Sequence, residues 1–133
     1  QERIEGTKEA CEASQIDYTY VDLPEDQAEV DRLIQEELNA GTDSFVALNN
    51  KCTLLALAAL NKCGVRIPED VRLISFDDSE AFKYMNPPVS ALRQPIVEIG
   101  LQTVDRMYER LKESQVPGKH FILECEFQSR GSH

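Results

Sequence analysis

Two neighbouring carboxylates, Asp77 and Asp78, directly follow a short apolar run over residues 71–76. That run is too short for a helix and is typical of a buried strand. In an open parallel sheet, ligands bind in the crevice beyond the carboxyl ends of the strands. The acidic pair is therefore a candidate binding site. The alternative is that both residues cap a turn or the next short helix, which Asp commonly does.

Similar polar side chains follow two other predicted strands. Asp22 ends the segment 17–23, and the pair Asn49-Asn50 comes directly after residues 45–48. Parallel strands place such residues at one edge of the sheet, beside Asp77 and Asp78. Carboxylates and amides without an accompanying nucleophile suit hydrogen bonding to hydroxyls and amines better than bond cleavage.

The catalytic alternatives have little support, and no catalytic residue or cofactor is predicted. His120 and His133 are the only histidines, and the six glycines are too scattered to form a phosphate-binding loop. A phospho-acceptor receiver domain would need a further Asp and a Lys, where this chain has Asn49-Asn50 and Arg93-Gln94. Adjacent carboxylates also lack the opposed geometry of a glycosidase.

The composition limits the class of protein and its partners. The 133 residues fit one domain, and 14 Lys and Arg against 24 Asp and Glu give a net charge of -10, which repels nucleic-acid phosphates and anionic membranes. No run approaches the roughly 20 apolar residues of a membrane span. The four cysteines have no metal-ligand spacing, and Cys52 and Cys63 would lie roughly 16 Å apart along one helix. We therefore expect reduced thiols, no metal site and a cytoplasmic protein.

Helices and strands alternate along the chain. Apolar periodicity and breakers predict helices over 3–13, from Pro24-Glu25-Asp26 to Gly41, over 54–60 with an end at Gly64, and from Pro95 to about Glu113 before Pro117-Gly118. Strands are predicted over 17–23, 45–48, 71–76, 89–92 and 121–127. This order predicts an α/β fold with an open parallel sheet and helices on both faces. The first helix has no leading strand, so we expect the chain to begin partway through a domain.

The whole chain resembles the lactose-repressor (LacI/GalR) family of transcription regulators in the order and spacing of its motifs. The motifs are Arg3-Ile4-Glu5-Gly6, Asn49-Asn50, residues 64–71 (GVRIPEDV), Phe76-Asp77-Asp78, Pro87-Pro88, Gln94-Pro95 with Gly100, and residues 127–132 (FQSRGS). The resemblance implies the C-terminal portion of an effector-binding domain with the type I periplasmic-binding-protein fold. It also implies that a sugar or a similar small polar effector changes DNA affinity; the alternative is a periplasmic-type solute-binding protein for transport.

The family's effector-binding positions can be transferred residue by residue. The resemblance implies that Arg3, Asn49 and Asp77 bind effector hydroxyls, and that Gln94 lies at the hinge and contacts sugar in some relatives. Leu23 takes a position that is often filled by an aromatic residue stacking on the ligand. Two positions depart from the family pattern: Asn50 stands where an Asp is usual, and Ser75 where a Gly is usual.

The resemblance also predicts how the chain is divided and with what it assembles. Residues 1–94 and 119–133 would form the C-terminal subdomain, and 95–118 a helix of the N-terminal subdomain, which is otherwise missing. The helix's apolar side chains, Ile96, Val97, Val104, Met107 and Leu111, would then lack a partner within the chain, so a second copy or further chain should cover them. DNA would be bound by a helix-turn-helix domain absent from this chain. A homodimer is expected through Leu54, Leu57, Ala58, Tyr84 and Met85.

Overall fold

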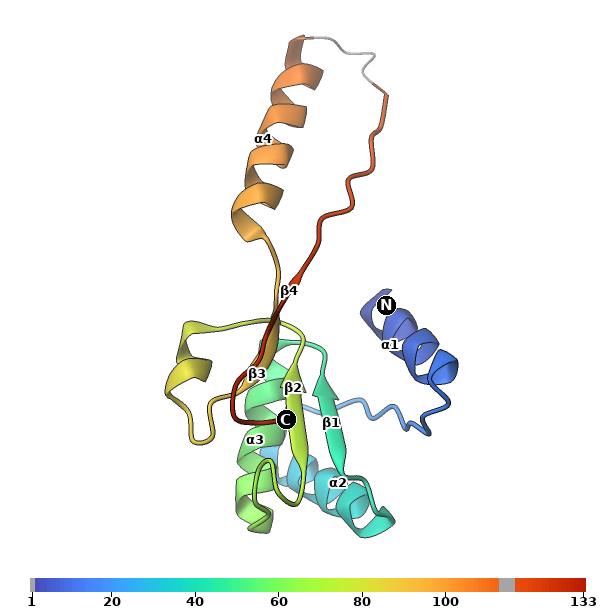
Figure 1. The fold of residues 1–133 in the computed structure, drawn as a ribbon, viewed down its shortest axis with the longest axis vertical. Coiled ribbons are helices and arrows are strands. Elements are labelled where there is room, and N and C mark those ends of the chain that lie inside the picture. The colour runs from blue at the N-terminus through green and yellow to red at the C-terminus, as the bar shows by residue number, and fades with distance from the viewer. Residues whose placement is uncertain (1, 113–116) are drawn as a thin grey trace.

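The computed structural model describes residues 2–112 and 117–133 and contains one four-stranded sheet with helices (Figure 1). Strands β1 to β3 are parallel, and β4 is antiparallel to β3. The predicted α/β fold with an open sheet is confirmed. It differs from the predicted parallel sheet with helices on both faces in two ways: β4 makes the sheet mixed, and among the described elements α2 and α3 cover one face. In chain order the elements are α1 (Glu2–Ala13), α2 (Gln27–Ala40), β1 (Ser44–Ala47), α3 (Asn50–Cys63), β2 (Arg72–Ser75), η1 (Glu80–Tyr84), β3 (Ser90–Arg93), α4 (Ile96–Lys112) and β4 (Glu126–Gln128).

Local signals in the sequence determine where α2 and α3 end. Gly41 and Gly64 follow the two helices with φ of 96° and 71°, a left-handed conformation that glycine adopts without steric cost. Both predicted ends are confirmed. Helix α3 begins four residues earlier than the apolar run at Leu54, because the Asn49 side chain accepts a hydrogen bond from the Cys52 backbone N–H at 2.8 Å and caps the helix.

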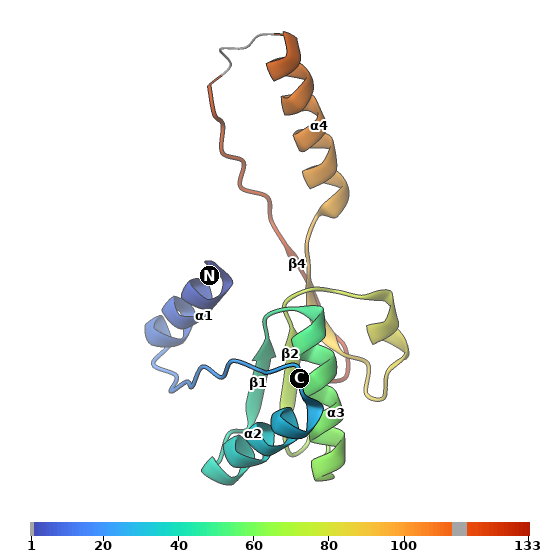
Figure 2. The same cartoon turned by 180° about the vertical axis from the view of Figure 1, so that it is seen from behind.

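Helices α2 and α3 pack on each other and form the main core with the sheet. Figures 1 and 2 show both helices on the same side of the strands, whereas α1 lies beyond the end of β1 and does not cover the other face. On that other face Val46 of β1 is 49% exposed. The largest fully buried apolar side chains are those of Val30, Leu60, Leu73, Phe82 and Val89.

One predicted strand is wrong and another is only partly correct. The segment 17–23 is irregular, and Tyr18 and Tyr20 are exposed, because no strand lies beside them to complete a ladder. β-propensity depends on such neighbours more than on the residues themselves. The predicted strand 121–127 is reduced to Glu126–Gln128, because the chain before it runs alongside α4 and away from β3 (Figure 1).

Helix α4 projects away from the sheet, as both views show (Figure 2). Its predicted apolar face is indeed without a partner within the described residues: Val97 is 79% exposed and Leu111 83%, with Ile96, Val104 and Met107 also exposed. The described helix runs to Lys112, and the predicted end near Glu113 lies outside the described residues.

The segment after β4 returns to the sheet and connects β2 with β3. Ser132 is fully buried; its hydroxyl donates to the Leu73 carbonyl at 2.5 Å and accepts from the Ser90 N–H at 2.9 Å. The Leu73 N–H in turn donates to the Ser132 carbonyl at 2.7 Å. One short segment thus satisfies backbone groups of two neighbouring strands.

Substitution Ser132→Ala should lower the free energy of unfolding by about 1–3 kcal/mol, because it leaves a buried backbone N–H and carbonyl without their partner. Urea denaturation would measure the change. Ser129→Ala is the matched control, since Ser129 is exposed and should change stability by no more than about 0.5 kcal/mol. Equal stabilities of the two variants would contradict the role given to the Ser132 hydroxyl.

Candidate functional site

Three of the predicted site residues meet at the carboxyl end of β2. Arg3 of α1 donates through Nη1 to Asp77 Oδ2 at 2.8 Å and to the Leu48 carbonyl at 2.7 Å. The Gln94 side chain, which follows β3, donates to Asp77 Oδ1. The side chains of Arg3 and Asp77 are 37% and 23% exposed, so the group is accessible to a solute. Elements far apart in the sequence therefore surround one carboxylate.

An aromatic ring orients the Arg3 guanidinium. Its central carbon lies 4.5 Å from the centroid of the Phe76 ring, a distance at which a cation–π interaction is favourable. Phe76 directly precedes Asp77, so one short segment both packs its aromatic ring against the Arg3 guanidinium and supplies the carboxylate that pairs with its charge. A planar guanidinium held in this way presents its remaining N–H groups in a defined direction.

Asn49 and Leu23 are placed differently. Asn49 follows Leu48, whose carbonyl binds Arg3, so it lies at the same edge of the sheet. Its side-chain oxygen caps α3, whereas its amide nitrogen has no hydrogen bond with any described residue. Leu23 is partly buried and packs against the hydrophobic core. No hydrogen bond or ion pair in the described ranges joins Asp22 to Arg3, Asp77 or Gln94.

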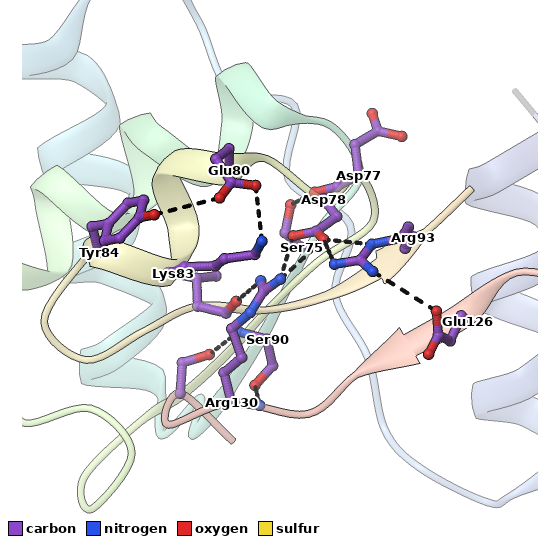
Figure 3. Close-up of polar contacts among 12 residues, drawn as sticks. Ser75, Asp77, Asp78, Glu80, Lys83, Tyr84, Ser90, Arg93, Glu126 and Arg130 are labelled. Carbon is purple, nitrogen blue, oxygen red and sulfur yellow. Dashed lines mark hydrogen bonds and ion pairs between the residues drawn. The ribbon is translucent and has the colours of Figure 1, made fainter. Parts of the chain in front are cut away.

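The second carboxylate has a different environment. Asp78 Oδ2 accepts hydrogen bonds from Arg93 Nε and Nη2 at 3.0 and 2.8 Å and from Arg130 Nη2 at 2.9 Å. The side chains of Asp78 and Arg130 are only 9% and 11% exposed. Figure 3 shows the Asp77 carboxylate pointing away from this group. The two adjacent acids thus have separate roles: one is open to solutes and the other is held by two arginines.

The charge state of Asp78 results from two opposing effects. Burial raises the pKa of Asp78, but hydrogen bonds from Arg130 and Arg93 and the charges of both guanidinium groups lower it more, so its pKa lies below the usual value. Asp78 is therefore a carboxylate throughout the neutral range. The sequence did not reveal this cluster, because Arg93 and Arg130 lie 15 and 52 positions away from Asp78.

A buried pair of hydroxyl groups connects α3 with the segment that carries Asp77. Thr53 Oγ1 and Ser75 Oγ are hydrogen bonded at 2.7 Å, and Ser75 Oγ also donates to the Asp77 carbonyl at 2.8 Å. Both residues are fully buried. Ser75, which departs from the pattern of the resembling family, therefore ties the first turn of α3 to the segment that carries Asp77.

The surroundings of the site complete its description. An open groove of about 700 Å³ adjoins it, lined by residues of η1, the end of β3 and the start of α4, among them Lys83, Arg93, Gln94, Ile96 and Leu101. Within residues 2–112 and 117–133, no group of three His, Cys, Asp or Glu side chains is arranged to hold a metal ion. None of the helices in those ranges is long and apolar enough to cross a membrane.

The predicted dimer residues do not all lie on the surface. Leu54 is 49% and Tyr84 80% exposed, and Ala58 is exposed as well. Leu57 is buried and belongs to the core, and Met85 packs against that core. Leu57 therefore contributes to the hydrophobic core and not to the exposed surface of α3.

The periplasmic binding protein-like domain matches the chain over residues 1–133. The chain belongs to this family. The HTH-type transcriptional repressor PurR of Aliivibrio fischeri is 28% identical over 103 residues, which cover 77% of this chain and 31% of that protein. Curated relatives also include the regulator MalR of Streptomyces coelicolor. The resemblance to LacI-type regulators is thus confirmed.

Solved structures support the same assignment. A LacI-family regulator from Enterococcus faecium with bound ribose has a TM-score of 0.79 and 26% identity, covering 97% of this chain and 49% of its own. The regulator CelR in complex with cellobiose has a TM-score of 0.83 and 26% identity, covering 99% of this chain and 42% of its own. The chain therefore spans about half or less of each of these relatives.

Substitution Asp78→Ala should lower the free energy of unfolding at neutral pH by about 3 kcal/mol, because it leaves two guanidinium groups without their buried partner. A carboxyl group with a lowered pKa stabilises the fold above the ordinary pKa of Asp, about 3.9, and this stabilisation is lost as the pH falls. Denaturation between pH 7 and pH 2 should therefore show the difference from wild type shrinking in acid. Asp17→Ala, at an exposed position, is the control, and a difference that does not depend on pH would contradict the assignment.

Proposed function

We propose that this chain is the effector-sensing part of a LacI-type DNA-binding transcriptional regulator, and that it is not an enzyme. The observation that carries the proposal is the accessible carboxylate of Asp77, surrounded by Arg3 and Gln94 at the edge where three elements meet. Hydrogen-bonding groups are concentrated there without a nucleophile, which suits recognition of a polar solute.

The chemistry of the site supports an uncharged ligand with hydroxyl groups. Asp77 accepts hydrogen bonds, whereas the remaining N–H groups of Arg3 and the free amide nitrogen of Asn49 donate them. Adjacent sugar hydroxyls both donate and accept, so they match such a mixed set. The Arg3–Asp77 pair carries no net charge, which removes the electrostatic preference for an ion. The ribose and cellobiose complexes of related regulators agree with this class of ligand.

The same proposal accounts for the shape of the chain. Residues 1–94 and 119–133 are the C-terminal subdomain, and 95–118 supply a helix to a second subdomain, whose chain covers the exposed face of α4. Ligand bound between the subdomains favours one arrangement of the two and so changes DNA affinity. DNA is contacted by a helix-turn-helix domain outside these 133 residues, in keeping with the net charge of -10 on this part.

Substitution Asp77→Ala in the full-length regulator should weaken binding of ribose or cellobiose at least tenfold. The reason is that a hydrogen bond to a charged group such as the Asp77 carboxylate is worth about 1.5–3 kcal/mol, and about 1.4 kcal/mol corresponds to a tenfold change in affinity. Titration calorimetry would measure the dissociation constant. Asp17→Ala serves as the control, because it removes an exposed carboxylate elsewhere. An affinity that is unchanged by Asp77→Ala would rule out this residue as an effector ligand.

Dimerisation is proposed through the exposed side chains of Leu54, Ala58 and Tyr84. Substitution Leu54→Lys should yield a folded monomer, because it places a charge in an apolar contact between two copies. Sedimentation equilibrium would give the mass. Ile16→Lys is the control, since Ile16 is also exposed but lies outside this surface. A Leu54→Lys protein that still sediments as a dimer would refute the interface.

A further inference from the structure

The adjacent residues Asp77 and Asp78, which follow β2, bind two adjacent residues at the end of β3. Asp77 accepts a hydrogen bond from Gln94, and Asp78 accepts two from Arg93 at 3.0 and 2.8 Å. The first pair belongs to the candidate binding site, whereas in the second the Asp78 side chain is buried and the Arg93 side chain is 42% exposed. Asp77 is joined to Asp78 by a peptide bond, and Gln94 is joined to Arg93 in the same way. A movement of the Asp77–Gln94 pair therefore displaces the Asp78–Arg93 pair.

The second pair lies where the chain leaves the sheet and returns to it. Arg93 is the last residue of β3, and α4 begins three residues later at Ile96. The returning chain forms β4, in which Glu126 is the register partner of Arg93 and lies 3.9 Å from its guanidinium group. Figure 1 shows α4 and the returning segment joined to the sheet through β3 and β4 alone.

Arg130 completes the cluster from the returning side. Its Nη2 donates to Asp78 at 2.9 Å, and its Nη1 donates to the Val89 carbonyl at 2.5 Å, just before β3. Figure 3 shows Arg93 and Arg130 on either side of the Asp78 carboxylate. With the side chains of Asp78 and Arg130 about nine-tenths buried, water competes little for these contacts. Asp78 therefore holds both β3, which leads into α4, and the segment after β4 in fixed positions relative to β2.

We propose that Asp78, Arg93 and Arg130 are positioning residues that couple occupancy at Asp77 to the direction in which α4 leaves the sheet. The proposal rests on the function proposed above. A ligand hydroxyl that bonds to Asp77 Oδ1 displaces the Gln94 amide from it. Gln94 can then turn only about its neighbour Arg93, which Asp78 holds in place. Ligand binding at Asp77 thus rotates the segment that leads from β3 into α4, because Asp78 prevents Arg93 from moving independently.

The first test separates coupling from binding. In the full-length regulator, the dissociation constant of a DNA duplex selected from a random pool is measured with and without ribose or cellobiose. Asp78→Asn should reduce the ratio of these two constants at least threefold and change the dissociation constant of the sugar less than threefold. Asp31→Asn is the matched control, because Asp31 is a largely buried carboxylate paired with Lys62 on the helical layer. An unchanged ratio, or a ratio that falls only in step with sugar affinity, would overturn the proposal.

The second test needs no ligand. The equilibrium constant of unfolding of the full-length regulator is measured for wild type, Gln94→Ala, Asp78→Asn and the double variant. If the two pairs act as one unit, Gln94→Ala should change the unfolding constant by a factor that differs at least threefold between the two backgrounds. Equal factors would refute the linkage. Failure of both sugars to bind the wild-type regulator would instead refute the proposed class of ligand, so the two failures are distinguishable.

Discussion

The compensation of one buried negative charge by two guanidinium groups determines the geometry of this part of the molecule. A buried carboxylate is costly unless it is paired and hydrogen bonded, and Asp78 meets both conditions through Arg93 and Arg130. The requirement brings together a turn after β2, the end of β3 and the segment after β4. Asp77 then lies at the edge of the sheet, where its carboxylate, bonded to Arg3 and Gln94, stays accessible to a solute.

The elements with strong local signals were predictable from the sequence. Gly41 and Gly64 end their helices because only glycine enters the required conformation without cost, and that preference is a property of single residues. The site at Asp77 was predictable because a short apolar run is typical of a buried strand in a parallel sheet, and the residues that follow it lie at the carboxyl end of that strand. The meeting of Arg3 with Asp77 followed from the family pattern and not from spacing, since 74 positions separate the two residues.

What could not be predicted depends on distant partners. Tyr18 and Tyr20 have high β-propensity, yet in the described part of the chain no strand lies beside them with which they could pair. Leu57 and Leu54 both look like apolar surface or core residues in the sequence, and only the packing of α3 shows that the first is buried and the second exposed. Asp78 resembled a second ligand to the same solute until Arg93 and Arg130 were found beside it.

The contacts of Ser132 bear on the order in which the sheet can form during synthesis. Ser132 and Leu73 are 59 positions apart, and the hydroxyl of one satisfies the carbonyl of the other. Chains fold from the N-terminus as they are made, so β2 and β3 leave the ribosome before the residue that bridges them. Until residues 130–132 follow, the pair of strands carries unsatisfied backbone groups, and such long-range contacts are slow to form. During synthesis α2, α3 and β1 are therefore complete before the far side of the sheet has all of its hydrogen bonds.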